Sequence, residues 1–575
     1  MKRRMRKICS ILLCGCVTFS ICACGMEKGE SNQKSSSKSE ADGLTTMKVG
    51  YARDTSFHYE GEETAENNAW LDLYHENGID LNVIYDVDLS QKTEKLAQTI
   101  MSGDYPDFMD VDSKNFTGWA QQGVFADLTD GFDKYASDEV KKYYDSEAGK
   151  RALQAATVDG KLYSLPVVAT PNDSMPLLWI RQDWLDNLGL DIPETVDDFY
   201  KVAKAFKEND PDKNGKADTY GFAVNGKDVF QQVGDLGTYF EMFGAQPGYF
   251  SNIIPFIEED KKAVFGGMKS DEMKDGLTLL QNMYNEGLIS QDFVTSGQDQ
   301  INQDMAAGKV GMTFSIFYGA EAPWKNALET QPEADFVSAP IPGVTEEERG
   351  QAFYTALPSQ YYCMSSKFDD MEAFFTMVNL HMQYLAQPDK LSQEDYEKYN
   401  GLPGKYTGYT LAVAAFAVPD KNMVGWERIQ NALKGDTSEL NAENTRDFEA
   451  MQVYCDNKDR RAELNETELA AFNGGILYWS VYGNEHCAYQ SLNEMVDMDH
   501  YLYSTYDNAA TEKMNECTTS LITLTKETLV DIIAGNKSVD SYDDFLKQWN
   551  SLGGKEITEE ADAWYQSAKT SESAE

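Results

Sequence analysis

The amino-acid sequence predicts an α/β fold with two lobes around a cleft. Strand-like and helix-like segments alternate between Thr45 and Val111, and a second series of this kind begins near Lys161. The length of 575 residues allows more than one hydrophobic core. Hydrophobic residues make up 42% of the chain and charged residues 25%, which is typical of globular proteins.

The first module has the order strand, helix, strand, helix, strand. We expect strands over 45–51, 81–87 and 108–111, and helices over 65–77 and 91–102. Apolar and polar residues alternate in the second strand, whereas the apolar residues of the first helix recur on one face. This spacing favours a parallel βαβ sheet, in which ligands bind beyond the carboxyl ends of the strands.

The second module also contains segments with strand-like and segments with helix-like spacing of apolar residues. Residues 177–181 read as a strand, 183–188 begin a helix, and 196–206 carry an apolar stripe at helical spacing. Further strands are expected over 312–317 and 336–339. Two α/β modules with several crossing segments predict two lobes.

The N-terminus has the features of a secretory signal. Residues 1–7 hold five basic side chains, and the apolar run from Ile8 to Ala23 is too short for a mature membrane-spanning helix. Residues 21–25 resemble a bacterial lipobox, which implies that Cys24 becomes the lipid-modified first residue. The alternative is an ordinary signal peptide that is cleaved nearby. The stretch up to residue 43 is rich in Ser, Lys and Glu and predicts a flexible tether.

These patterns give an expected domain organisation. It comprises a signal peptide (1–23), a lipidated tether (24–43), lobe 1 (44–165 plus about 300–360) and lobe 2 (about 166–299 plus 361–570). We expect a monomer on the extracellular face of the cytoplasmic membrane, held there only by its lipid anchor.

Charge and cysteine content exclude several classes. The net charge of −45 disfavours a nucleic-acid partner, and the mean hydropathy of −0.51 disfavours a multi-span membrane protein. Four cysteines remain after the leader, namely Cys363, Cys455, Cys487 and Cys517. They have no C-x-x-C spacing, so no zinc site is predicted, while one or two disulfides stay possible.

Residues 210–221 resemble an EF-hand calcium loop. The oxygen ligands at loop positions 1, 3, 5, 7 and 9 would come from Asp210, Asp212, Asn214, the carbonyl of Lys216, and Asp218. Gly221 stands where an EF-hand has a bidentate Glu, so a carboxylate from elsewhere would have to complete the shell. The alternative is a polar turn between a helix and a strand. The calcium would be structural.

One segment carries a family resemblance. The run Trp179-Ile180-Arg181-Gln182-Asp183-Trp184-Leu185, followed by Leu188-Gly189, Pro193, Thr195 and Asp198-Phe199, is similar to the hallmark segment of family 1 extracellular solute-binding proteins. Weaker similar segments occur in the expected order at 102–107, 123–128, 307–312 and 533–549. These proteins are lipoprotein receptors of bacterial ABC importers, mostly for carbohydrates.

The resemblance implies a fold and a mechanism. It implies a two-lobed periplasmic-binding-protein-like fold in which each lobe is a β-sheet flanked by helices and hinge crossings join the lobes. A carbohydrate that bridges both lobes would favour the closed state, which then docks on the permease. No catalytic cofactor is implied.

Candidate ligand contacts are polar or aromatic residues placed after predicted strands or in irregular segments. A sugar has apolar ring faces and polar edges, so a site needs aromatic planes and hydrogen-bonding side chains. The candidates are Asp112, Asn172, Asp173, Asp235, Tyr318, Trp324, Tyr361 and Trp479. Trp179 and Trp184 are expected in the core.

Enzymatic readings have little support. The chain contains no H-E-x-x-H, G-x-S-x-G or phosphate-binding glycine motif, and its five histidines form no paired motif. We therefore expect no catalysis. Because 95 residues are Asp or Glu, an extracellular glycoside hydrolase stays an alternative, as does a glycan-binding surface adhesin.

Overall fold

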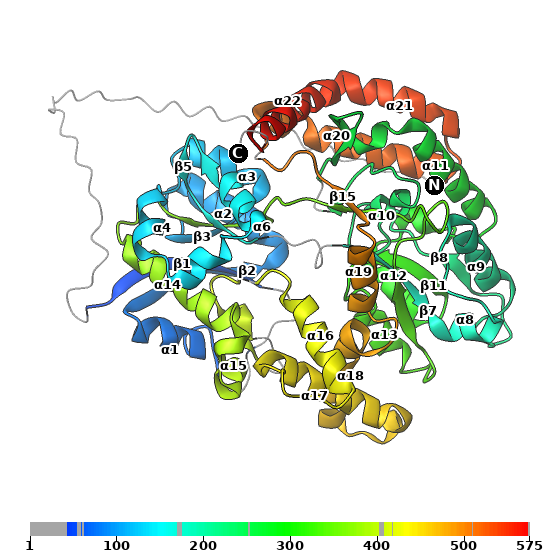
Figure 1. Cartoon of the computed structure of the whole chain (residues 1–575), viewed down its shortest axis with the longest axis horizontal. Helices are drawn as coiled ribbons and strands as arrows, with labels where there is room; N and C mark the ends of the chain where they lie inside the picture. Colours follow the sequence, from blue (N-terminus) through cyan, green and yellow to red (C-terminus); the bar gives the residue numbers. More distant parts are fainter. Residues whose placement is uncertain are drawn as a thin grey trace, which may run out of the picture.

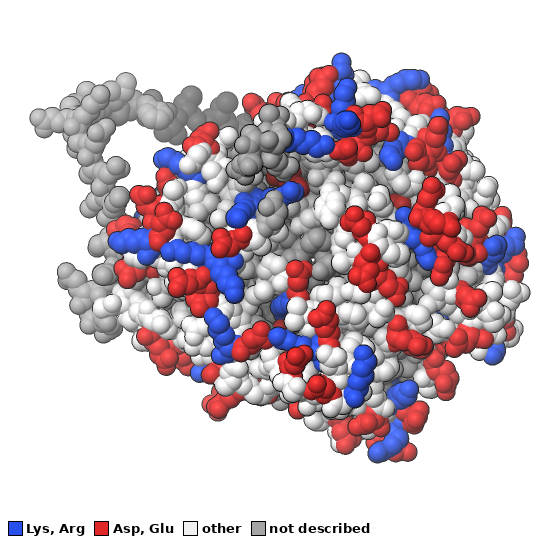
Figure 2. All heavy atoms as spheres, viewed as in Figure 1, with Lys and Arg blue, Asp and Glu red and all other residues white. Residues whose placement is uncertain are grey.

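The computed structural model describes residues 43–53, 59, 62–168, 175–250, 253–401, 408–416, 418–508 and 510–572. Two lobes, each with its own β-sheet and its own buried core, make up the chain (Figure 1). The predicted two-lobed α/β architecture is therefore confirmed. Acidic side chains are spread over both lobes on the face seen in Figure 2, in keeping with the net charge of −45.

The sheet of the first lobe has five strands in the order β2-β1-β3-β14-β6. These strands are β1 (Thr45–Arg53), β2 (Ile79–Asp88), β3 (Phe108–Asp112), β6 (Leu165–Pro166) and β14 (Gln360–Met364). Strand β1 pairs in parallel with β2 and β3, as the βαβ spacing predicted, whereas β14 is antiparallel to β3. Every second residue of β1 is buried, so one face of the strand faces the core.

Helices cover both faces of this sheet. They are α1 (Ala69–Glu76), α2 (Lys92–Ser102), α3 (Ser113–Gln121), α4 (Thr129–Tyr135), α5 (Asp138–Tyr143), α6 (Glu147–Ala155), α14 (Met371–Leu385) and α15 (Gln393–Asn400). A small hairpin of β4 (Thr157–Val158) and β5 (Lys161–Leu162) precedes β6.

The sheet of the second lobe has four strands in the order β12-β7-β11-β8. Their bounds are Leu177–Arg181 for β7, Tyr220–Phe222 for β8, Val310–Ser315 for β11 and Phe336–Ala339 for β12. All five residues of β7 are buried, so this strand lies inside the sheet with both faces covered. Trp179 and Trp184 are fully buried, which confirms their predicted place in the core.

Thirteen described helices and two strand pairs complete the second lobe. The helices are α8 (Gln182–Leu188), α9 (Val196–Glu208), α10 (Leu236–Glu241), α11 (Ser270–Asn285), α12 (Gln298–Ala306), α13 (Glu321–Ala327), α16 (Lys421–Leu433), α17 (Ala442–Asn457), α18 (Glu466–Tyr478), α19 (Ala488–Asp497), α20 (Glu512–Ile533), α21 (Tyr542–Trp549) and α22 (Lys555–Glu572). Strand β9 (Phe256–Glu259) pairs with β10 (Lys262–Phe265), and β13 (Ala352–Tyr354) pairs with β15 (Tyr501–Tyr503).

Two segments lie in the lobe opposite to the predicted one. The segment of about 300–360 was expected in lobe 1, but β11 and β12 flank β7 in the second sheet. The segment 361–570 was expected in lobe 2, but in its first part β14 pairs with β3, and α14 packs into the first core. From Ile429 on, the segment contributes to the second core as expected. Elsewhere the prediction is wrong because strand partners are set by long-range pairing, and local periodicity carries no information about it.

Among the described residues, membership of the two cores changes at three places along the sequence. These passages lie between Val168 and Met175, between Ala352 and Tyr361, and between Phe416 and Ile429. The second passage is fixed by Asp507, whose Oδ1 accepts hydrogen bonds from the hydroxyl of Thr355 at 2.8 Å and the amide of Ala356 at 3.1 Å. The second passage, which is described throughout, is a candidate hinge segment.

Two further observations concern the whole described chain. None of the helices within the described ranges is long and apolar enough to cross a membrane. The four cysteines outside the leader all lie in described ranges, and each is a free thiol in this structure. The signal peptide, Cys24 and the tether lie outside the described residues.

Candidate functional site

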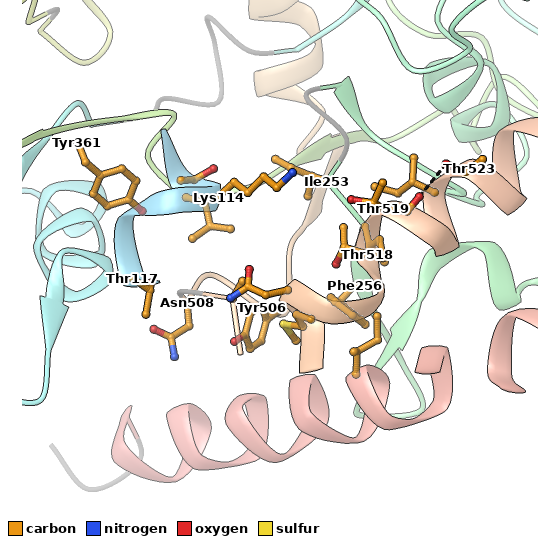
Figure 3. Close-up of a pocket in the computed structure, with 18 of the residues that line it drawn as sticks. Lys114, Thr117, Ile253, Phe256, Tyr361, Tyr506, Asn508, Thr518, Thr519 and Thr523 are labelled. Atoms are coloured by element: carbon orange, nitrogen blue, oxygen red, sulfur yellow. Dashed lines mark hydrogen bonds between the residues drawn. The ribbon is translucent and has the colours of Figure 1, made fainter. Parts of the chain in front are cut away.

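A cavity of about 400 Å³ lies between the two lobes (Figure 3). The first lobe contributes α3 and the passage into β14, and the second lobe contributes the start of β9, the segment before α20, α20 itself and α22. The lining residues are Ser113, Lys114, Thr117, Ile253, Ile254, Phe256, Leu357, Tyr361, Tyr506, Asn508, Ala510, Met514, Asn515, Thr518, Thr519, Ile522, Thr523, Lys526 and Ile557. A solute in this cavity would therefore touch both lobes.

Two tyrosines combine an aromatic plane with a hydroxyl at this cavity. Tyr361 lines the cavity and stacks on Phe116 of α3 with ring centroids 4.3 Å apart and planes 14° apart. Only 2% of the residue is exposed. Tyr506 packs edge-on against Phe256 at 5.9 Å. Burial raises the pKa of Tyr506 to about 12 and that of Tyr361 well above its ordinary value. Both hydroxyls therefore stay protonated and can donate a hydrogen bond.

Hydroxyl and amide groups form much of the remaining wall. Helix α20 presents Thr518, Thr519 and Thr523, and Figure 3 shows the hydrogen bond of 2.8 Å that Thr523 donates to the carbonyl of Thr519. On the opposite wall, Oγ1 of Thr117 is buried and has no hydrogen-bond partner among the described residues. A buried hydroxyl without a hydrogen-bond partner destabilises the folded protein, and a ligand that forms this hydrogen bond would remove the penalty.

Two lysines reach this cavity from opposite lobes. Lys114 extends from α3 across the cavity toward Ile253 (Figure 3). Lys526 on α20 forms an ion pair of 2.5 Å with Asp228 and also lies over the ring of Phe230.

The predicted ligand contacts divide into three groups. Tyr361 lines the cavity. Asp112 ends β3 and caps α3, where its carboxylate accepts hydrogen bonds from the amide of Asn115 at 2.9 Å and the hydroxyl of Thr93 at 2.7 Å. It therefore lies directly before the cavity residue Ser113 without lining the cavity itself. Asn172 and Asp173 lie outside the described residues.

The other predicted contacts do not line this cavity. Trp324 is fully buried in the second core and donates a hydrogen bond of 3.0 Å to the carbonyl of Ala334, so its prediction as a ligand contact is wrong. The physical reason is that its ring packs against Phe336 and Tyr454 in this core. Tyr318 is 43% exposed after β11, and the half-buried Trp479 packs 6.0 Å from Tyr454. Their roles stay predictions.

Asp235 is a buried helix cap. Its Oδ2 accepts a hydrogen bond of 2.7 Å from the amide of Thr238 at the start of α10, and the residue is 7% exposed. Burial raises the pKa of this carboxyl to about 6. Asp235 does not line the cavity, and its Oδ1 is buried without a hydrogen-bond partner among the described residues. Its role as a ligand contact stays a prediction.

Sequence reasoning missed the wall formed by α20. The threonines at 518, 519 and 523 carry a usable signal, because hydroxyl side chains are poor helix formers and are rarely concentrated in a long helix without a reason. What the sequence could not show is that this helix faces α3, which lies about 400 residues earlier in the chain.

The EF-hand-like loop has part of the geometry that a cation needs. The backbone turns through positive φ at Asp210 and Gly215, and the amide of Gly215 donates to Asp210 Oδ2 at 3.0 Å. The Asn214 amide donates to Asp212 at 2.6 Å and to Asp218 at 3.3 Å. Burial, aided by the neighbouring charges of Asp210 and Asp218, raises the pKa of Asp212.

This loop does not form a complete metal site. Within the described part of the chain, no three or more His, Cys, Asp or Glu side chains are grouped closely enough to hold a metal ion. The residues thus fit a calcium shell only in part, and the glycine at position 12 accounts for the missing bidentate carboxylate.

Two α/β lobes, the passages between them and a cavity bounded by both define the class of bilobal solute-binding proteins. A family profile described as bacterial extracellular solute-binding protein matches residues 58–361. The chain belongs to this family.

Curated relatives and solved structures agree with this assignment. Lipoprotein LipO of Bacillus subtilis is 28% identical over 339 residues, which cover 58% of this chain and 62% of LipO. The fructooligosaccharide ABC transporter substrate-binding protein FusA of Streptococcus pneumoniae is 32% identical over 235 residues, 37% of this chain and 41% of FusA. The sequence matches thus span less than two thirds of these relatives.

The structural similarity extends further than the sequence similarity. The structure of FusA in complex with kestose aligns with a TM-score of 0.62 and 17% identity over 92% of this chain and 100% of that structure. An extracellular solute-binding protein from Bifidobacterium longum subsp. infantis gives a TM-score of 0.61 and 19% identity over 92% and 99%. At this identity the similarity establishes the fold.

Proposed function

We propose that this protein is the substrate-binding lipoprotein of an ABC importer and that it captures an oligosaccharide between its lobes. The observation that carries the proposal is the cavity shared by α3 and Tyr361 of one lobe and α20 of the other. A solute held there makes more contacts when the lobes are close together, so it has a higher affinity for the closed state and shifts the equilibrium toward it. No bond has to form or break.

Three features favour an oligosaccharide as the solute. Tyr361 and Tyr506 place aromatic rings in the cavity wall, while threonine and asparagine side chains offer hydrogen-bonding groups for sugar hydroxyls. The names of several relatives also refer to oligosaccharides or polysaccharides, among them fructooligosaccharide for FusA and polygalacturonan/rhamnogalacturonan for YtcQ of Bacillus subtilis. In this role the protein would bind one protein partner, the membrane permease of the importer.

The anchoring follows from the leader sequence. Cleavage before Cys24 and its lipidation would place the two lobes on the extracellular face of the cytoplasmic membrane, with the stretch up to residue 43 as a tether. The relative LipO is named a lipoprotein. Labelling of cells with a radioactive fatty acid should mark the protein, and Cys24→Ala should abolish the label. An unlabelled wild-type protein would refute the anchor.

A ligand screen tests the carbohydrate assignment. Purified protein lacking residues 1–24 is screened against oligosaccharides by thermal shift, and each hit is followed by calorimetry. Binding should raise the melting temperature, because a ligand that binds only the folded state stabilises it. If only peptides or amino acids bind, the carbohydrate assignment is wrong and the receptor class stands.

The same material separates the receptor from the two alternatives. A glycoside hydrolase would release product from a chromogenic glycoside or shorten the bound oligosaccharide during incubation. An adhesin would bind an insoluble polymer without binding its short fragments. A receptor returns its ligand unchanged, and solution scattering should show a smaller radius of gyration when the ligand is bound.

We further propose that the loop of Asp210, Asp212, Asn214, Lys216 and Asp218 binds a structural calcium ion, with one carboxylate recruited from outside the loop. Support comes from the turn at Gly215 and from the mutual repulsion of the three carboxylates, which a cation would relieve. The solved structures of FusA include an EF-hand mutant. The ion would stabilise the connection between α9 and β8 and take no part in chemistry.

A further inference from the structure

The cavity between the lobes differs in charge from the rest of the molecule. Of the 575 residues of the chain, 95 are Asp or Glu and 50 are Lys or Arg. Yet among the nineteen described residues that line the cavity there is no Asp or Glu, while there are two lysines, Lys114 and Lys526. The lining is therefore basic in a strongly acidic protein.

The two lysines are not equivalent. Lys526 is paired with Asp228 at 2.5 Å, so a carboxylate of the protein already balances its charge. Lys114 is exposed and forms no ion pair or hydrogen bond with a residue that the structure describes. Asp112, two positions earlier, does not face it on the helix, and its carboxylate is engaged with Asn115 and Thr93.

The position of Lys114 is unfavourable for the helix itself. It lies in the first turn of α3, where the partial positive charge of the helix dipole disfavours a cation, and this turn contains no acidic residue. The N-cap carboxylate of Asp112 offsets part of this charge, and an anion bound beside Lys114 would offset more of it. The side chain nevertheless extends into the cavity, as Figure 3 shows.

The hydrogen-bonding character of the wall points in the same direction. Sugar hydroxyls commonly donate hydrogen bonds to carboxylates, and the described lining of the cavity contains no carboxylate. Its charged groups are the two ammonium groups, which only donate, and the hydroxyls of Tyr361 and Thr117 can donate as well, the latter having no partner among the described residues. Donors of this kind fit a ligand group that only accepts.

We propose that the solute is an acidic oligosaccharide and that Lys114 binds a sugar carboxylate in this cavity. The inference rests on the proposed function and names the class of its substrate. The carboxylate replaces the missing acidic partner of Lys114, and Thr117 and Tyr361 are the neighbouring donors for the same sugar. At about 400 Å³ the cavity lies near the lower end of the range for small-molecule sites, so it would take one end of a longer chain.

Matched acidic and neutral ligands test the proposal. Calorimetry compares oligogalacturonates and glucuronate-containing oligosaccharides with their neutral galactose and glucose counterparts. An acidic member should bind at least about tenfold more tightly than its neutral counterpart, because hydrogen bonds to charged groups are worth more than neutral ones. Its affinity should fall as the salt concentration rises, since salt screens the interaction.

Variants of Lys114 assign the effect to this residue. Lys114→Gln should reduce the affinity for the acidic ligand about tenfold or more and remove most of its salt dependence, while Lys114→Arg should retain much of the binding. Lys142→Gln, an exposed position on α5 that does not line the cavity, is the control and should bind like wild type. Equal melting temperatures would show that all variants fold.

The possible failures are distinguishable. If neutral oligosaccharides bind as tightly as acidic ones, or if Lys114→Gln leaves the acidic affinity unchanged, the acidic assignment is wrong and the receptor function stands. If no carbohydrate of either kind binds, the proposed function itself fails, and this inference fails with it.

Discussion

The guanidinium of Arg151 on α6 lies 3.8 Å from the carboxylate of Asp507, so a cation of the first lobe faces an anion of the second. The same carboxylate receives hydrogen bonds from Thr355 and Ala356, in the passage that leads from β13 to β14. Asp507 therefore ties together a hinge segment and both lobes. Its position makes it a determinant of how the lobes are held relative to each other.

Removing this carboxylate should destabilise the protein and loosen the hinge. Asp507→Ala leaves the Thr355 hydroxyl and the Ala356 amide without their acceptor, so we expect a loss of about 1–3 kcal/mol in the free energy of unfolding. Asp507→Asn keeps an acceptor for both donors and should lose less. Urea denaturation measures the difference. Equal losses for the two variants would mean that the charge facing Arg151, rather than the hydrogen bonds, is what matters.

The buried Asp235 should make stability depend on pH. Because burial raises the pKa of this carboxyl from 3.8 to about 6, the folded state binds its proton more tightly than the unfolded state. Its contribution to stability is thus fully present below about pH 4 and is lost as the pH rises through about 6. The expected loss is on the order of 3 kcal/mol.

Asp235→Asn provides the test, because the amide keeps an oxygen for the Thr238 amide but does not titrate. The free energy of unfolding is measured by urea denaturation between about pH 4 and pH 7 for both proteins. The difference between variant and wild type should change over this interval in favour of the variant. A constant difference would show that Asp235 has an ordinary pKa.

Trp324 should act as a core residue and not as a ligand contact. Trp324→Ala removes a fully buried side chain packed against Phe336 and should cost about 3–5 kcal/mol. Met101→Ala, at a side chain that is 80% exposed, is the matched control and should change stability by less than about 0.5 kcal/mol. Thermal and urea unfolding supply the comparison. A stable Trp324→Ala protein with weakened ligand binding would restore the original prediction.

Calcium should stabilise the loop between α9 and β8. If the proposed ion is bound, adding EDTA should lower the melting temperature of the wild-type protein, and excess calcium should restore it. Asp212→Asn should make the protein insensitive to both, whereas Asp197→Asn, in the first turn of α9 and outside the loop, should behave like wild type. Identical melting curves of the wild type with and without EDTA would exclude the ion.

The local elements of the fold were predictable because their signals are local. The strands at 177–181 and 336–339 have the predicted bounds, and α9 has the predicted apolar stripe at Phe199, Val202 and Phe206. The Trp179–Phe199 segment also predicted the family through its resemblance to the hallmark segment, and in the structure Trp179 and Trp184 are buried while Thr195 caps α9.

The site was predictable only in part. Tyr361 was expected to contact the ligand, and it lines the interlobe cavity. Trp324 was expected there because it follows a predicted strand, whereas Tyr361 was expected because it lies in a predicted crossing between the lobes; Trp324 faces the core. A position after a strand does not by itself decide whether a side chain points into the cavity or into the lobe.

The sequence by itself determined the α/β class, the family and the acidic character of the chain, because periodicity, short motifs and charge are properties of neighbouring residues. Only the tertiary structure decided that β14 joins β3 in the first lobe, that β11 and β12 flank β7 in the second, and that α20 lies across a cavity from α3. These relationships join residues hundreds of positions apart. They depend on which apolar surfaces of distant segments pack against each other with the most buried area, and this depends on all segments of the chain together.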